Sequence, residues 1–302
     1  MRKQFIINSR KIITCGLWLI LCLFFKTSLS GQEINQIKTD KVTLDLFALP
    51  YLHLGPQAAA FIIHDVGNVD IHYTPNDGQL TYFFQRATRL KIINEDGVDY
   101  ASVNIPIELP GETRYKVSKI SGATYWLENG SLKKDKLDAK NILEKAESKL
   151  TVLKIKFPRA GPGCIIDLNY TLVGDFLPQP IRWQFQQGIP VLLSQFSYAY
   201  PEYIKSEETL KGYISIKKVI DKVDHLNPVN VTPTDGYGTK LTTSSHIFIP
   251  QEFNKLYLKG YQAINVPPFK EAPHLPAEKN QPAVFLCRMT PQTAVTQTIH
   301  PK

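Results

Sequence analysis

The chain has 302 residues, of which 43% are hydrophobic, and it carries a formal net charge of +8. Residues 1–30 contain five basic and no acidic residues, so the formal charge of residues 31–302 is only +3. A nearly neutral chain gives no support for binding to nucleic acid or to an anionic membrane surface. A chain of this length and composition can bury a large core without disulfide cross-links.

The N-terminus is typical of a secretory signal peptide. Basic residues precede an uncharged, apolar run of 14 residues from Ile12 to Phe25, and the small residues Ser28 and Ser30 follow. This run is shorter than the about 20 residues that cross a bilayer as a helix, so we favour cleavage after Ser30 over an uncleaved signal anchor. We expect a secreted or periplasmic protein with no integral membrane segment after cleavage.

Cysteine usage does not indicate a disulfide scaffold. Cys15 and Cys22 belong to the predicted signal peptide, which leaves Cys164 and Cys287 in the exported chain. Export would permit one cross-link, but disulfide-stapled domains carry many more cysteines. We therefore expect no disulfide.

Strand patterns recur along the remaining chain. β-Branched and aromatic residues alternate with polar ones and are interrupted by Gly, Pro and Asn-Gly pairs. The expected strands cover residues 57–73 (two short strands), 81–93, 98–107, 116–137 (a hairpin), 151–157, 164–173, 182–186, 194–201, 211–219, 244–249 and 256–263.

Two local features shape the predicted fold. Asn129 and Gly130 predict a tight hairpin turn, because both residues tolerate the positive φ angles that such a turn needs. The sequence NEDG predicts a second hairpin between 81–93 and 98–107, and only 138–150 is compatible with a short helix. Many short strands without intervening helices predict an all-β fold, a large two-layer antiparallel β-sandwich with at most one or two short helices.

The domain organisation follows from these patterns. We assign 1–30 to the signal peptide, 31–54 to an N-terminal lead-in segment, 55–273 to the β-sandwich and 274–302 to an irregular C-terminal tail. The tail is rich in Pro, Thr and Gln and shows little alternation. This loss of pattern motivates the hypothesis that the chain is a truncated or frame-disrupted gene product.

Three stretches occur in a specific order and spacing: RLKIINEDGVDYASVNIPI from Arg89, ISGATYWLENGSLKKDKL from Ile120 and FPRAGPGCIIDLNYTLVGDFLPQPIRWQFQQGIPVLLSQFSYAYPEY from Phe157. Together they resemble the domain of unknown function that forms the N-terminal β-sandwich part of secreted bacterial transglutaminase-like proteins. The resemblance extends weakly over most of 55–273. It implies an extracytoplasmic module ahead of a domain with a Cys-His-Asp site, and that transglutaminase core is absent from this chain.

The resemblance implies no activity for the sandwich itself. We expect a non-catalytic binding or support module for protein or glycan, not an enzyme, with no cofactor, and the sequence does not predict its oligomeric state. Two alternatives stay open. One is a cysteine-dependent hydrolase or acyltransferase that uses Cys164, and the other is an inactive fragment of a longer transglutaminase-like protein.

Residues with catalytic or metal-binding potential are few. Cys164 begins a predicted strand with no helix N-terminus or neighbouring histidine to activate its thiol, which favours packing over catalysis. The sequence places His64, Asp65, Asp70 and His72 close together. Successive residues of a strand point to opposite faces, so one hairpin cannot direct all four at one metal ion. We assign no catalytic residue and no metal site.

Aromatic residues supply the weak binding candidates. Trp126, Trp183 and Phe185 could stack on a sugar or fill a pocket in a partner protein. Trp183 and Phe185 lie two residues apart and so face the same side of a strand, which favours burial in the core. Only exposure of both side chains would support a binding role.

The last candidate, Arg86, lies in a strand with two other basic residues. Arg89 and Lys91 alternate with Leu90 and Ile92, so we expect both basic side chains on a solvent-facing side. Arg86 is in phase with the aliphatic residues and points inward unless a bulge switches the face. It is therefore either a rim residue or a buried ion-pair partner.

Overall fold

The computed structural model describes residues 41–49, 57–74, 79–108, 115–147, 150–175, 180–225, 255–271 and 280–291. The described residues form 14 strands and three short 3-10 helices, which confirms the all-β fold class. The predicted signal peptide, its cleavage position after Ser30 and the strand expected over 244–249 lie outside these ranges. Within the same ranges, no helix has the length and apolar character needed to cross a membrane.

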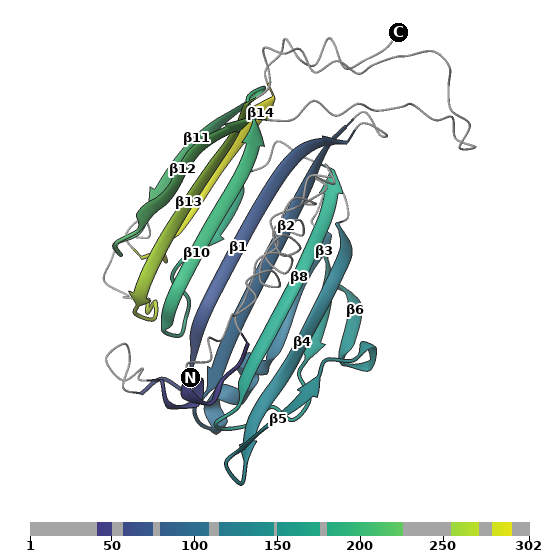
Figure 1. Ribbon diagram of the computed structural model, residues 1–302, viewed down its shortest axis with the longest axis vertical. Coiled ribbons are helices and arrows are strands. Elements are labelled where there is room, and N and C mark those ends of the chain that lie inside the picture. Colours follow the sequence, from purple (N-terminus) through teal and green to yellow (C-terminus); the bar gives the residue numbers. More distant parts are fainter. Residues whose placement is uncertain are drawn as a thin grey trace, which may run out of the picture. The chain divides into compact units, whose positions relative to one another are not determined.

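One layer of the sandwich is an eight-stranded sheet (Figure 1). Its strands are β1 (Ala60–Thr74), β2 (Gln79–Ile92), β4 (Lys116–Glu128), β5 (Ser131–Lys136), β8 (Ile165–Asp175), β10 (Val191–Pro201), β12 (Lys217–His225) and β13 (Lys255–Val266). They follow the order β12-β13-β10-β1-β2-β8-β4-β5. Every neighbouring pair is antiparallel except β1 and β10, which are parallel. The connection between these two strands includes β2 to β9, and a parallel pair requires such a long connection.

Two three-stranded sheets pack on one face of this large sheet. The first contains β9 (Ile181–Gln184), β11 (Ile204–Lys211) and β14 (Val284–Pro291), and the second contains β3 (Ser102–Glu108), β6 (Ile142–Glu147) and β7 (Leu150–Lys156). Side chains from all three sheets share the main hydrophobic core, among them Phe196 of β10, Phe285 of β14 and Ile155 of β7. Burial of this apolar surface between the layers supplies the main driving force for folding.

Of two turns that the sequence predicts in the large sheet, one is present and the other is absent. Asn129 and Gly130 have φ angles of 51° and 74° and form the expected turn between β4 and β5. The expected pair of short strands over 57–73 is wrong, because β1 runs unbroken through Gly67. A Cβ atom on Gly67 would collide with the ring of Trp183, so this glycine permits close packing between the layers rather than a turn.

Two other local predictions are also wrong. The strands on either side of NEDG do not form a hairpin, because the 3-10 helix η2 (Glu95–Ala101) carries the chain from the large sheet to β3, which pairs with β7. The short helix expected over 138–150 is limited to η3 (Ala139–Asn141), and β6 follows. Pairing of β6 with β7 outweighs the weak helical preference of that stretch.

The C-terminal boundary of the sandwich also needs correction. The predicted irregular tail over 274–302 contains β14, the central strand of a three-stranded sheet. Phe285, Cys287 and Met289 alternate along β14 and are fully buried. Cross-strand partners in β9 and β11 stabilise this strand, and those pairings are too distant in the sequence to recognise from local pattern.

The opposite face of the large sheet carries a second, smaller core. The 3-10 helix η1 (Leu44–Ala48) and its flanking residues pack over Phe61, Ile63 and Ile165. Lys91 contacts η1 through the backbone carbonyl of Phe47 and is only 8% exposed, and Arg89 on the same face pairs with Asp167 and is only 3% exposed. Their predicted shared face is correct, but its predicted exposure is wrong.

Removal of the Phe285 side chain tests the corrected boundary. We expect Phe285→Ala to lower the free energy of unfolding by about 3–5 kcal/mol, because it leaves a cavity among the rings of Phe196, Tyr198 and Tyr261. Urea denaturation measures the change. Leu210→Ala, at an exposed position of β11, is the control and should cost less than about 0.5 kcal/mol. A Phe285→Ala loss no larger than the control would contradict the place of β14 in the core.

Candidate functional site

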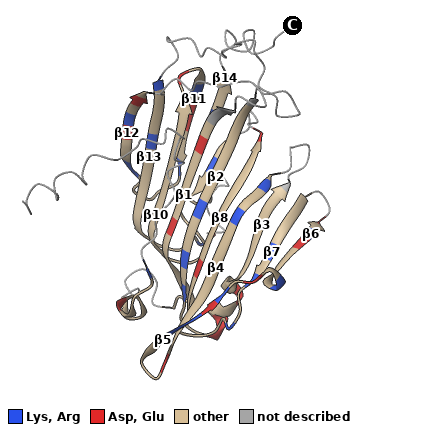
Figure 2. Ribbon diagram, turned by 45° about the vertical axis from the view of Figure 1, so that its right-hand side comes forward, with Lys and Arg blue, Asp and Glu red and all other residues tan. Residues whose placement is uncertain are grey.

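An ion pair lies inside the sandwich, between the two layers. Arg86 Nε lies 2.8 Å from Asp65 Oδ1, and Arg86 Nη2 lies 2.7 Å from Asp65 Oδ2. Thr88 donates a further hydrogen bond to Asp65 Oδ1 over 3.0 Å. The Asp65 side chain is 1% exposed and that of Arg86 is 31% exposed. Figure 2 shows the basic positions of β2 beside acidic positions of neighbouring strands.

A β-bulge explains why Asp65 points inward. The register between β1 and β2 shifts between Ile62 and His64, which leaves Ile63 without a partner. The extra residue changes the phase of β1, so that Ile62 and Asp65 both face the main core. The sequence alone places Arg86 inward, and in the structure this half-buried arginine is the ion-pair partner of the buried Asp65.

The electrostatic setting favours the charged form of Arg86. Burial by itself lowers the pKa of Arg86, but the Asp65 carboxylate and the Tyr170 hydroxyl outweigh burial and raise that pKa above its ordinary value. The guanidinium also lies over the ring of Trp183, with 5.1 Å between Cζ and the ring centroid. All strong interactions of Arg86 are therefore internal, which indicates a structural role.

Trp183 and Phe185 are core residues, as the alternation argument favoured. Trp183 is 3% exposed, and Phe185 is fully buried. The Trp183 indole nitrogen donates a 3.1 Å hydrogen bond to Ser194 Oγ, and its ring stacks on Phe196 at 5.2 Å. Neither side chain is available to an external ligand.

A second polar cluster surrounds Glu208. Tyr198 and Tyr261 donate hydrogen bonds to its carboxylate, and Lys259 Nζ lies 2.7 Å from Oε1. Burial by itself raises the pKa of Glu208, but hydrogen bonds from these three groups outweigh burial and lower it. The cluster joins β11 to β10 and β13, and so connects the two layers.

The two described cysteines are free thiols in separate places. Cys164 directly precedes β8, and Cys287 lies in β14. Burial raises the pKa of Cys164, and it raises the pKa of Cys287 to about 11. Both thiols therefore stay protonated near neutral pH, whereas a nucleophile needs the thiolate.

The histidine and aspartate candidates do not converge on a metal ion. Asp65 faces the core, whereas His64 precedes it on the opposite face of β1. The side chain of His72 lies outside the described residues. Within the described ranges, no three His, Cys, Asp or Glu residues are grouped so that they could hold a metal.

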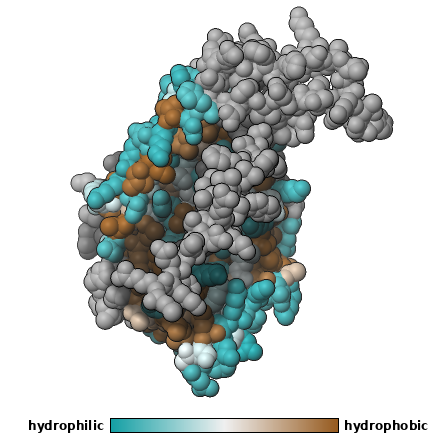
Figure 3. Space-filling view, in the orientation of Figure 1, coloured by the Kyte–Doolittle hydropathy of each residue, from teal (hydrophilic) through white to brown (hydrophobic). Residues whose placement is uncertain are grey.

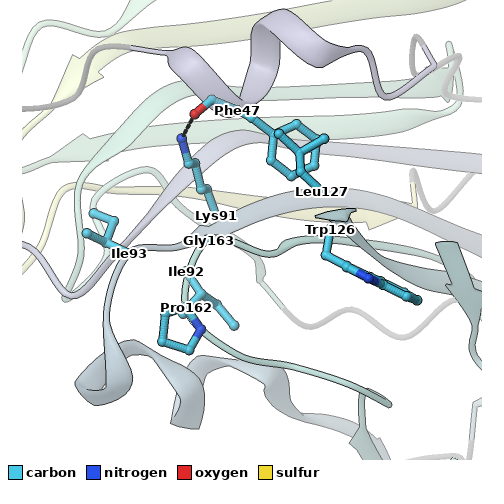
Figure 4. Close-up of a pocket in the computed structure, with 8 residues that line it drawn as sticks. All are labelled: Phe47, Lys91, Ile92, Ile93, Trp126, Leu127, Pro162 and Gly163. Atoms are coloured by element: carbon cyan, nitrogen blue, oxygen red, sulfur yellow. Dashed lines mark hydrogen bonds between the residues drawn. The ribbon is translucent and has the colours of Figure 1, made fainter. Parts of the chain in front are cut away.

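A pocket of about 390 Å³ lies at one end of the large sheet (Figure 4). It is formed by η1, the end of β2, the end of β4 and the loop before β8. The lining residues are Phe47, Lys91, Ile92, Ile93, Trp126, Leu127, Pro162 and Gly163. Among the four weak candidates from the sequence, only Trp126 contributes to this pocket, which we call the hairpin pocket.

The rim of the hairpin pocket combines apolar and basic groups. Leu127 and Leu132 are cross-strand partners in the β4–β5 hairpin and are 43% and 38% exposed. Arg159 Cζ lies 5.3 Å from the centroid of the Trp126 ring, and Arg159 Nε lies 3.5 Å from Asp135. Figure 3 shows hydrophobic residues close to the tip of this hairpin.

Sequence reasoning did not identify the remaining pocket residues. Strand alternation places Lys91 on a solvent-facing side, and Phe47 falls in the segment 31–54, to which the sequence assigns no structure. The Gly161-Pro162-Gly163 sequence does predict a sharp turn, and in the structure this turn brings the loop before β8 to the end of β2, where it lines the pocket. The approach of η1 depends on long-range packing and leaves no local pattern.

No family model matches the chain, and no curated protein matches it. Among solved structures, it is similar to a "putative protease" from Parabacteroides distasonis, with 13% identity and a TM-score of 0.53 over 76% of this chain and 40% of that chain. At this identity, the similarity concerns the fold alone. The chain spans less than half the length of that protein.

Two other solved structures have a TM-score of only 0.31, which is too low to indicate a shared fold. One is a "putative nutrient binding protein" from Legionella pneumophila, with 9% identity over 77% of this chain and 67% of that chain. The other is an M1 zinc metallopeptidase from Deinococcus radiodurans, with 11% identity over 78% of this chain and 43% of that chain. None of the three is described as a transglutaminase.

The Glu208 cluster predicts a specific acid sensitivity. A carboxylate whose pKa is lower in the folded than in the unfolded state stabilises the fold above the unfolded pKa and loses this effect as the pH falls through the folded pKa. When the pH falls from about 6 to about 3, we therefore expect the free energy of unfolding to decrease more in the wild type than in Glu208→Gln.

Urea denaturation at both pH values measures this difference. Glu207→Gln, at the adjacent, 61% exposed side chain of β11, is the matched control and should follow the wild type. Equal acid losses in Glu208→Gln and the wild type would show that the cluster does not hold Glu208 in its charged form.

Proposed function

We propose that this chain is a non-catalytic, exported β-sandwich module that binds a polypeptide partner through the hairpin pocket. The observation that carries the proposal is the pocket itself. Phe47 and Leu127 form apolar walls there on the face of the sheet that carries η1, next to the exposed pair Leu127 and Leu132. Trp126 lines the pocket from the other face of β4, because successive residues of a strand point to opposite faces (Figure 4). A concave apolar site with an aromatic wall is the usual form of a binding site for a side-chain anchor.

The chemistry of the pocket favours a polypeptide over a glycan. An aromatic ring can stack on a sugar, but a sugar also needs hydrogen-bonding groups for its many hydroxyls. The eight lining residues include no carboxylate, amide or hydroxyl side chain, and Lys91 provides the only polar side chain apart from the Trp126 indole. Aliphatic side chains of a peptide fit such walls better.

A binding or support role is also consistent with the interior. Asp65 pairs with Arg86, Glu208 is held by three donors, and the thiols of Cys164 and Cys287 are buried. These groups are occupied inside the sandwich and are poorly placed to act on a substrate. The expected position ahead of a transglutaminase-like domain belongs to the same proposal and rests on the sequence resemblance.

Peptide selection tests the proposed function. A random phage-displayed peptide library is selected against the exported chain, and the enriched peptides are synthesised and titrated. We expect Trp126→Ala to weaken their binding at least about tenfold, because a central aromatic anchor commonly accounts for about 2 kcal/mol or more. Thermal unfolding confirms that the variant is folded.

Tyr213→Ala is the matched control, because Tyr213 is a 74% exposed aromatic residue outside the pocket. This variant should bind the selected peptides as tightly as the wild type. Absence of enriched peptides, or equal binding by Trp126→Ala, would overturn the proposal. Trp126-dependent binding on a glycan array without peptide binding would replace the polypeptide with a sugar.

A further inference from the structure

We propose that the hairpin pocket recognises a carboxylate, with Lys91 as its anion-binding group. The ligand would be a polypeptide that places a carboxylate beside an apolar side chain. This inference rests on the proposed function, because it names the ligand chemistry of the same site.

The first argument is the position of the Lys91 ammonium. Lys91 is 8% exposed and lines the pocket, where Nζ donates a hydrogen bond to the backbone carbonyl of Phe47 (Figure 4). Nζ also lies 5.9 Å from the centroid of the Phe61 ring. A carbonyl and an aromatic face stabilise a cation only in part, and an ammonium has three N–H donors.

The second argument comes from the other buried or half-buried cations of the large sheet. Arg86 pairs with Asp65, Arg89 lies 2.6 Å from Asp167, and Lys259 pairs with Glu208. Among the described residues, Lys91 has no carboxylate within 4.0 Å. Burial alone acts on its pKa and lowers it. A desolvated cation without a counterion is costly, and a bound carboxylate would offset that cost.

The third argument is the surface around the pocket. The apolar side chains of Phe47 and Leu127, which line the pocket on the same face of the sheet as Lys91, would contact a side chain next to the carboxylate. Lys133, Lys134 and Arg159 lie on the hairpin and the loop beside it. Among the described residues, Lys133 lies 3.7 Å from Glu128 and Arg159 lies 3.5 Å from Asp135, which leaves the basic groups in excess. The resulting positive excess would attract an acidic ligand.

A matched pair of small probes tests this inference. N-acetyl-L-leucine carries a carboxylate beside an apolar side chain, and N-acetyl-L-leucinamide is its neutral counterpart. Trp126 and Trp183 are the only two tryptophans of the exported chain, so its NMR spectrum has two indole N–H signals. The Trp126 signal reports on the pocket, and that of the buried Trp183 serves as the internal reference.

We expect the acid to shift the Trp126 signal and to bind about tenfold more tightly than the amide, as expected for one charge-assisted hydrogen bond. Lys91→Met retains the aliphatic stem and should remove the preference for the acid. Lys205→Met, at an exposed lysine of β11, should retain it. If Lys91→Met does not fold, the inference is tested by the affinities of the acid and the amide for the wild type alone.

A second matched pair identifies the source of the carboxylate. The blocked dipeptide amides N-acetyl-Leu-Glu-amide and N-acetyl-Leu-Gln-amide differ only in the charge of one side group. A preference for the glutamate peptide indicates an internal acidic residue as the natural ligand. A preference confined to N-acetyl-L-leucine indicates the C-terminal carboxylate of a polypeptide, and either result supports recognition of a carboxylate.

The outcomes separate this inference from the proposed function. If acid and amide shift the Trp126 signal with equal affinity, carboxylate recognition is wrong and polypeptide binding stands. The same holds if no small probe binds but selected peptides depend on Trp126 and not on Lys91. If neither small probes nor selected peptides bind at Trp126, both proposals are wrong.

Discussion

The ion pair between Asp65 and Arg86 is the interaction on which the register of the central strands depends. It joins β1 to β2 at the centre of the large sheet, and the Arg86 guanidinium packs on Trp183 of the opposite layer. A buried ion pair adds little net stability, because both charges lose their hydration. It does penalise alternative registers strongly, since a slip of one residue would move Asp65 to the other face of the sheet and leave Arg86 alone in the core.

Three basic residues of β2 illustrate how one strand distributes charge. Arg86 is paired inside the sandwich, Arg89 is paired with Asp167 on the opposite face, and Lys91 reaches the end of the sheet, where a backbone carbonyl is its hydrogen-bond acceptor. Strand alternation fixes which face each residue occupies. The neighbouring strands and η1 then decide whether that face supplies a counterion. The hairpin pocket exists because η1, the β4–β5 hairpin and the loop before β8 meet around this third residue.

Local chemistry predicted those parts of the structure that depend on neighbours in the sequence. The Asn129-Gly130 turn, the burial of Trp183 with Phe185 and the inward direction of Arg86 all follow from turn geometry and alternation. Prediction failed where distant pairing decides the outcome. The strand β14 lies within the predicted irregular tail, and the residues around NEDG connect two sheets instead of closing a hairpin. For the hairpin pocket, Trp126 was a candidate from its residue type, whereas Lys91 and Phe47 gain their roles only through the packing of η1.

A double-mutant cycle on Asp65 and Arg86 tests the central claim most directly. The unfolding free energies of Asp65→Asn, Arg86→Met and the double variant are compared with that of the wild type. We predict a coupling energy of about 2 kcal/mol or more, because each single variant leaves one buried polar group without its partner. The exposed pair Lys205 and Glu207, 3.1 Å apart on β11, should show less than about 0.5 kcal/mol in a parallel cycle. Additivity of the Asp65 and Arg86 variants within about 0.5 kcal/mol would show that the two residues do not interact in the folded protein and would contradict the register of the central strands.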